Sequence, residues 1–308
     1  MDEKEERLYK TAFKTFEEIQ KRQTIKDVIL YHYTSAAGLL NIVESGRFWA
    51  THYKFLNDPQ EITYSIDLIA KVFKENLEKF NIPHEYEFEL IPEYLKGYIS
   101  QHYDFYITGF SSSDDILSQW RAYGDNGDGY SIGIRLSNIQ CLDEELPFGS
   151  KGEQSERFCV VKLIYDPEEQ KKTIIDTLTI ILKNFNDIDV DESDKMKFCR
   201  ILFSYILEIL SILFKNQSFK EEAEWRFVGY RQAESNTTKI KYRNARHDII
   251  PYIELDFSGE PEGPMPICSI RCGPKQNLGK SRIVLERLLR SKGYKEMPEI
   301  LESSIPYA

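Results

Sequence analysis

The pattern of apolar and polar positions along the chain predicts a mixture of strands and helices. Short runs rich in β-branched and aromatic residues, typical of strands, lie at 30–34, 48–50, 104–111, 130–136, 159–165, 224–230, 249–256 and 267–272. Apolar positions spaced three or four apart, typical of amphipathic helices, lie at 2–22, 36–45, 58–80, 84–103, 114–123, 168–186, 192–215 and 281–292. Because strands and helices do not alternate strictly, we expect an α+β fold with a mainly antiparallel, twisted sheet, split or continuous, and flanking helices.

The domain organisation follows from the same pattern. No change in composition divides the 308 residues, so we expect a single domain over 1–308. The helical pair over 168–215 is interpreted as an insertion, and its second member is apolar almost all round, which requires burial. The charged amphipathic helix over 2–22 is expected to dock on the surface.

Composition and charge exclude several classes of protein. With 40 Lys and Arg against 50 Asp and Glu, the net charge is −10, which argues against a broad basic face for duplex DNA. The 5 cysteines are scattered, which favours a reducing cytosol over a disulfide framework. The first ten residues are charged, and the apolar run at 201–214 is interrupted by Glu208 and too short to span a bilayer. We therefore expect a soluble cytoplasmic protein.

The stretch from Leu30 to Glu61 is the densest in chemistry-bearing residues. It reads as a strand with His32, a short helix capped by Ser35, a second strand with Trp49, and a polar turn at Asn57. This density of polar and aromatic groups exceeds what a core needs, and it suggests a binding site.

Three other motifs favour structural interpretations. The loop 124–129 has the glycine spacing G-x-x-G-x-G and precedes a strand, so we expect a turn and not a dinucleotide loop. The segment 273–281 has five residues between its glycines, one more than a phosphate loop requires. Cys268 and Cys272 have no second Cys or His pair nearby, so we expect strand residues and no metal site.

The two acidic residues Glu222 and Glu224 allow two interpretations. They can form a solvated helix end in which Arg226 pairs with a carboxylate. Alternatively, being two residues apart on an extended segment, they point the same way. Two such carboxylates can bind a ribose hydroxyl and stabilise positive charge on an adjacent carbon.

The aromatic residues are equally ambiguous. A lone strand histidine such as His32 is more often structural than functional, and Tyr53 and Tyr64 fit ordinary packing. Trp120 with Tyr123 fits either an aromatic clamp or the edge of a core.

Four blocks of sequence together resemble a bacterial family known as the domain of unknown function 2971. They are His32-Tyr33-Thr34, Leu56-Asn57-Asp58 through Glu61, Phe110-Ser111 with Trp120, Tyr123 and the Gly129–Ile134 strand, and Glu222-Ala223-Glu224-Trp225-Arg226. The resemblance spans about residues 30–275, with the helical pair and both ends of the chain outside it.

A weaker resemblance points to the ADP-ribosyltransferase fold, in which a first-strand histidine contacts the NAD ribose, aromatics sandwich nicotinamide and a late glutamate binds a ribose hydroxyl. By motif, this resemblance implies that Glu224, Glu222 and His32 are catalytic. It implies NAD binding by residues that include His32, Tyr33, Thr34, Trp49, Tyr53, Asn57, Tyr64, Trp120 and Arg226. The chain departs from that fold's S-T-S signature, for which Tyr130-Ser131-Ile132 is a partial substitute.

Three functions remain as hypotheses. The first is an NAD-dependent ADP-ribosyltransferase-like enzyme, a toxin or antiviral-defence effector by analogy, acting on a protein or nucleic-acid acceptor without a metal. The second is a non-catalytic module that binds a nucleotide or nucleic acid, with Trp120 and Tyr123 stacking on a base and Arg121 or Arg226 on a phosphate. The third is a metal-dependent nuclease using Asp58, Glu61 and Glu224.

Overall fold

The computed structural model describes residues 28–56, 61–76, 103–138, 158–186, 210–232, 240–245, 248–258 and 264–307. The helix predicted over 2–22, almost all of the helix predicted over 84–103 and most of the second member of the helical pair lie outside these residues.

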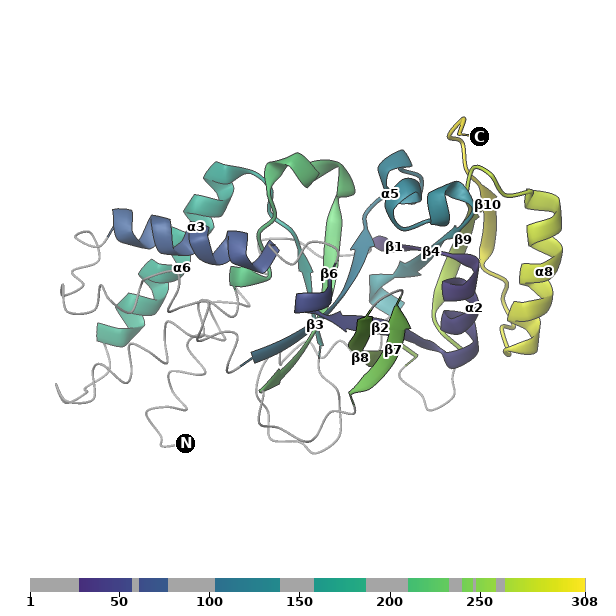
Figure 1. Cartoon of the computed structure of the whole chain (residues 1–308), viewed down its shortest axis with the longest axis horizontal. Helices are drawn as coiled ribbons and strands as arrows, with labels where there is room; N and C mark the ends of the chain where they lie inside the picture. Colours follow the sequence, from purple (N-terminus) through teal and green to yellow (C-terminus); the bar gives the residue numbers. More distant parts are fainter. Residues whose placement is uncertain are drawn as a thin grey trace.

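The predicted fold class is confirmed: the chain is a mixed α+β protein with a mostly antiparallel open sheet (Figure 1). The strands are β1 (Ile29–Thr34), β2 (Arg47–His52), β3 (Tyr103–Ser111), β4 (Tyr130–Arg135), β5 (Phe158–Lys162), β6 (Glu224–Gln232), β7 (Lys241–Ala245), β8 (Asp248–Asp256), β9 (Ile267–Cys272) and β10 (Glu299–Glu302). The α-helices are α2 (Ala36–Ser45), α3 (Glu61–Glu75), α5 (Leu117–Ala122), α6 (Pro167–Asn186) and α8 (Leu278–Ser291). The sequence pattern did not predict β7 or β10.

The sheet splits at β3. One edge of β3 pairs with β6 along its whole length, from Tyr103 to Ser111. Its other edge is shared: Ser111 pairs with Tyr31 of β1, whereas Ile107 pairs with Thr51 of β2. Between these two contacts, residues 108–110 have no strand neighbour on that edge within the described part of the chain. The strands β4, β9 and β10 continue from β1, and β8 and β7 continue from β2, so the two groups diverge from one edge.

The helix α2 connects β1 to β2, and residues at both of its ends fix where it begins and stops. The side chain of Ser35 caps α2 by accepting from the backbone N–H of Gly38, and Gly46 ends the helix with a left-handed φ of 66°. Leu39, Ile42 and Val43 on the inner face of α2 are buried in the core. The helix therefore returns the chain to the sheet on the far side of the split.

The helices α3 and α6 pack side by side at one end of the molecule (Figure 1). The Tyr64 hydroxyl of α3 donates to Gln170 Oε1 of α6 at 2.9 Å. The amide of Gln170 donates in turn to the backbone carbonyls of Ile164 and Lys215. This buried amide fixes an isolated parallel bridge between Ile164 and Phe214.

That bridge corrects one sequence prediction. A helix was predicted to continue to residue 215, but the described end of this segment is helical only at Leu210 and Ser211. It then turns at 212–213 and is extended at Phe214. The extended backbone at Phe214 can pair with Ile164, which a helix could not do. The change of conformation brings Lys215 to the end of β6.

Candidate functional site

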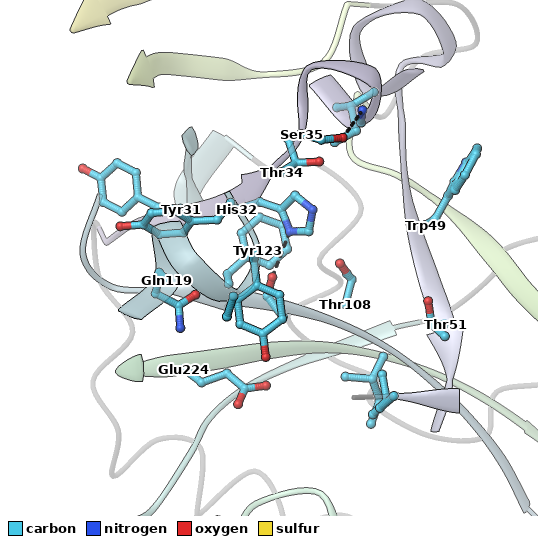
Figure 2. A pocket seen from close by; sticks show the side chains of 18 of the residues that line it. Tyr31, His32, Thr34, Ser35, Trp49, Thr51, Thr108, Gln119, Tyr123 and Glu224 are labelled. Carbon is cyan, nitrogen blue, oxygen red and sulfur yellow. Dashed lines mark hydrogen bonds between the residues drawn. The ribbon is translucent and has the colours of Figure 1, made fainter. Parts of the chain in front are cut away.

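A pocket of about 940 Å³ opens where the sheet splits. Residues 107–110 of β3 line it, together with residues of β1, α2, β2 and α5. Lys215, η6 (Gln217–Glu222), the start of β6 and Arg243 of β7 complete the lining. Its volume is in the range of small-molecule and cofactor sites. Figure 2 shows His32 and Tyr123 over Glu224, with Trp49 and Thr51 on the other side of the hollow.

His32 lies at the split itself. Its ring packs against Phe48 and Phe110, with both centroid distances at 5.2 Å. Its Nδ1 is 2.9 Å from the backbone oxygen of Gly109. A carbonyl can only accept, so Nδ1 carries the proton and Nε2 is left as an acceptor. Burial lowers the pKa of His32, although the bond to Gly109 opposes the shift, and the ring is therefore neutral at pH 7.

Glu224 begins β6 and lies across the pocket from His32 (Figure 2). Its Oε1 accepts from Arg226 Nε at 2.9 Å and its Oε2 accepts from Lys215 Nζ at 2.6 Å. Burial would raise the pKa of Glu224, but the charges of Arg226 and Lys215 outweigh burial and hold that pKa below its usual value. The carboxylate is therefore ionised and fixed in orientation.

Glu222 joins the same cluster by a different route from the one predicted. It ends η6 and is not extended, and Ala223 adopts a left-handed φ of 43° before β6 begins. The prediction that Glu222 and Glu224 point the same way on an extended segment is therefore wrong in its premise. The two carboxylates nevertheless meet, because Lys215 Nζ donates to both.

The backbone around Glu224 is held as firmly as its side chain. The N–H of Glu224 donates to the hydroxyl of Tyr165 at 3.0 Å. Burial raises the pKa of Tyr165 to about 12, so this hydroxyl is neutral. The carboxylate is thus presented to the pocket from a rigid strand end.

One wall of the pocket is α5 and the residue after it. Gln119 and Tyr123 line the pocket, and Tyr123 is 39% exposed. Trp120 instead points into the core, where it is fully buried and its Nε1 donates to Asp115 at 2.8 Å. Trp120 therefore belongs to the core, and Tyr123 belongs to the wall of the pocket.

The opposite wall is the face of β2 that carries Arg47, Trp49 and Thr51. Trp49 packs against Tyr252 of β8 at a centroid distance of 4.6 Å. Arg243 of β7 reaches the same wall, with its guanidinium 5.9 Å from the Trp49 ring centroid. Aromatic and cationic groups thus line the side of the pocket that faces Glu224.

The residues predicted from sequence divide into two groups. Those that line the pocket are His32, Tyr33, Thr34, Trp49, Glu222 and Glu224. Four lie elsewhere: Tyr53 packs on His52 and Phe105, Tyr64 is bound to Gln170, Trp120 is buried, and Arg226 donates to Glu224. Asn57 and Asp58 lie outside the described residues.

Among the pocket residues that sequence reasoning missed are Lys215, Thr51 and Arg243. Lys215 lies at the end of an apolar run, so it was interpreted only as the last residue of a predicted helix. A lysine beside an apolar segment that must be buried was a usable signal, because a buried ammonium needs carboxylate partners. No comparable signal in the sequence marks Arg243.

Two further findings concern metals and membranes. Among the described residues, no group of three or more His, Cys, Asp or Glu side chains could hold a metal ion. Cys268 and Cys272 lie on β9, as predicted, and Cys272 is buried. No helix in the described part of the chain is long and apolar enough to cross a membrane.

Residues 119–227, about a third of the chain, match the model of a family described as "Protein of unknown function (DUF2971)", which supports the family resemblance predicted from the sequence. The match runs through residues 168–215, so the helical pair that was placed outside the resemblance lies within the matched region. The matched region contains Gln119, Tyr123, Lys215, Glu222 and Glu224 of the pocket but not His32. No curated protein and no solved structure matches the chain.

Proposed function

We propose that this chain is an NAD-dependent ADP-ribosyltransferase-like enzyme, which releases nicotinamide and transfers ADP-ribose to a protein or nucleic-acid acceptor. One observation carries the proposal: His32 of β1 and Glu224 of β6, distant in sequence, line the same pocket between aromatic walls. A cytoplasmic location and a role as a toxin or antiviral-defence effector belong to the same proposal.

The state of Glu224 suits the bond-breaking step. When the bond between the ribose C1′ and the nicotinamide nitrogen breaks, the electron pair leaves with nicotinamide and positive charge develops on the ribose. An ionised, fixed carboxylate stabilises that charge more in the transition state than in the ground state. Because Lys215 and Arg226 already hold Glu224 in place, little reorganisation is needed during the reaction.

Glu222 suits the second half of the reaction. A new bond forms between C1′ and the acceptor nucleophile, whose proton must then be removed. Glu222 is a carboxylate bound to Lys215 Nζ and lines the pocket, so it can accept this proton. With water as the nucleophile, the same steps would hydrolyse NAD.

His32 and the aromatic residues suit substrate positioning. The free Nε2 of the neutral His32 ring can accept a hydrogen bond from a ribose hydroxyl. Tyr123 and Trp49 offer ring faces on which the planar nicotinamide or adenine can stack. These contacts would orient the glycosidic bond relative to Glu224.

The test is release of nicotinamide from labelled NAD by the purified chain, in the presence of a lysate that supplies protein and nucleic acid. Glu224→Gln should abolish release, and the label should identify the acceptor. The matched control is Glu75→Gln, because Glu75 makes an exposed pair with Lys171. Absence of nicotinamide release and of NAD binding in the parent chain would refute the proposal.

A second function is favoured by one specific observation: both oxygens of Glu224 already have cationic partners. A carboxylate so neutralised stabilises a ribose cation less than a free one, which fits a non-catalytic nucleotide-binding module. Each oxygen keeps a further lone pair for a ribose hydroxyl, so binding remains possible in both cases. A parent chain that binds NAD without releasing nicotinamide, and a Glu224→Gln variant that still binds NAD, would establish this second function.

A further inference from the structure

Arg243 is a cation in the pocket wall that lacks a carboxylate partner among the described residues. It lies in the middle of β7, and its Nη2 donates to Thr51 Oγ1 of β2 at 2.9 Å. Its Nε is buried and has no hydrogen-bond partner in the described part of the chain. A guanidinium has five N–H donors, and an unpaired buried donor costs free energy. A ligand that accepts a hydrogen bond from this group would therefore recover that free energy.

The neighbouring cations on the same face are different, because acidic residues of β8 neutralise them. Arg47 Nη1 lies 3.3 Å from Glu254 Oε2, and its Nη2 lies 3.6 Å from Asp256. Lys241 Nζ lies 2.8 Å from Glu254 Oε1. Arg243 is two residues from Lys241 on the same strand, yet no acidic residue in the described part of β8 pairs with it.

The orientation of Arg243 is fixed in advance of any ligand. Its guanidinium lies 5.9 Å from the centroid of the Trp49 ring, and the Thr51 hydroxyl holds one end of the planar group. Burial lowers the pKa of Arg243 from its usual value, and the nearby Tyr252 opposes the shift. Arginine nevertheless stays protonated in proteins, so a half-buried positive charge faces the pocket.

The position of this charge within the pocket suggests what it binds. In Figure 2, Trp49 and Thr51 lie across the hollow from His32 and Glu224. A dinucleotide has its reactive ribose at one place and its diphosphate a few bonds away. With the ribose at His32 and Glu224, the diphosphate would extend toward β2 and β7, where a planar cation matches a phosphate bidentately.

We propose that Arg243, held by Thr51 and Trp49, forms an anion subsite that takes a phosphate group of the bound dinucleotide. The identity of the ligand rests on the function proposed above, whereas the subsite rests only on the wall of β2, β7 and β8. On the other side of the pocket, the two cations beside Glu224 are already paired with carboxylates. Arg243 has no such partner among the described residues, so we expect the phosphate at Arg243, which sets the direction in which the ligand lies.

The experiment measures dissociation constants of the full-length chain for three probes: ADP-ribose, inorganic pyrophosphate and nicotinamide riboside, which has no phosphate. Arg243→Gln should weaken ADP-ribose and pyrophosphate by roughly 10- to 100-fold and leave nicotinamide riboside unchanged, because one charge-assisted contact is removed. Arg243→Lys should recover part of the loss, because it keeps the charge but not the planar fork. Lys241→Gln, on the same strand, should change none of the three constants.

Three results would overturn the subsite: unchanged binding of ADP-ribose to Arg243→Gln, an equal loss of all three probes, or no binding of either phosphate probe to the parent chain. Pyrophosphate binding that depends on Arg243, in a chain that neither binds nor cleaves NAD, would keep the subsite and refute the proposed function. Nicotinamide release that is unaffected by Arg243→Gln, with ADP-ribose bound as before, would keep the proposed function and refute the subsite.

Discussion

The ring of His32 lies in the split of the sheet, and its Nδ1–H donates to the backbone carbonyl of Gly109 of β3 at 2.9 Å. Gly109 lies on the part of the β3 edge that neither β1 nor β2 covers, so its carbonyl needs a partner other than a strand. The same imidazole presents its other nitrogen as an acceptor. One side chain therefore completes the fold and contributes to the pocket.

Protonation of His32 is expected to destabilise the fold. Its pKa in the folded chain is below the ordinary value of 6.5, so as the pH falls below about 6.5 the unfolded chain takes up the proton first. The free energy of unfolding should then fall with decreasing pH, by at most about 1.4 kcal/mol per pH unit from this group. The measurement is chemical denaturation of the parent chain and of His32→Gln between pH 5 and 8. A stability difference between the two that does not change with pH would contradict this assignment.

Lys215 is expected to be essential for stability. Lys215→Met leaves two carboxylates, Glu222 and Glu224, in a buried cluster without their shared cation. Breaking a buried ion pair from one side costs about 3–5 kcal/mol. Lys171→Met is the control, since it removes an exposed pair at 3.7 Å that contributes at most about 1 kcal/mol. Equal melting temperatures for the two variants would show that the cluster does not hold the end of β6.

Asp115 is expected to fix the pocket wall formed by α5. Its carboxylate accepts from Trp120 Nε1 at 2.8 Å, from Ser303 Oγ at 2.6 Å, and from the N–H and hydroxyl of Ser304 at 2.7 and 2.8 Å. Asp115→Asn places an amide among these donors and should cost about 1–3 kcal/mol. Trp120 fluorescence should shift to the red as the indole gains access to water. The exposed Asp128 gives the control variant Asp128→Asn, and an unshifted spectrum for Asp115→Asn would exclude this role.

Gly129 is expected to tolerate no side chain. A Cβ there would lie 2.3 Å from the Thr34 carbonyl oxygen and 2.7 Å from backbone atoms of Gly124, none of which can rotate away. Gly129→Ala should therefore cost about 1–3 kcal/mol or more, and it should displace Thr34, which lines the pocket. Gly279→Ala, in the first turn of α8, meets only Asn277 Oδ1 at 3.4 Å and should be neutral or stabilising by up to about 1 kcal/mol. Unfolding of both variants in urea measures the contrast.

Local chemistry made much of the fold predictable. Ser35 and Gly46 marked the two ends of α2, and the aromatic and β-branched runs located β1, β3, β4, β6, β8 and β9. These signals act between residues close in sequence, so they can be recognised without knowledge of the fold. Short edge strands lack them: β7 carries the polar sequence KYRNA and owes its conformation to pairing with β8.

The sequence by itself predicted the α+β class, the family resemblance, and His32 and Glu224, which line one pocket. Only the tertiary structure decided which other residues join them. Lys215 reaches Glu224 because an extended bridge replaces a predicted helix, and Arg243 reaches Thr51 because β7 and β8 extend the sheet beyond β2. The same long-range packing turned Trp120 into the core and took Tyr64 to α6. Such contacts join residues far apart in the chain, and periodicity and propensity describe only neighbours.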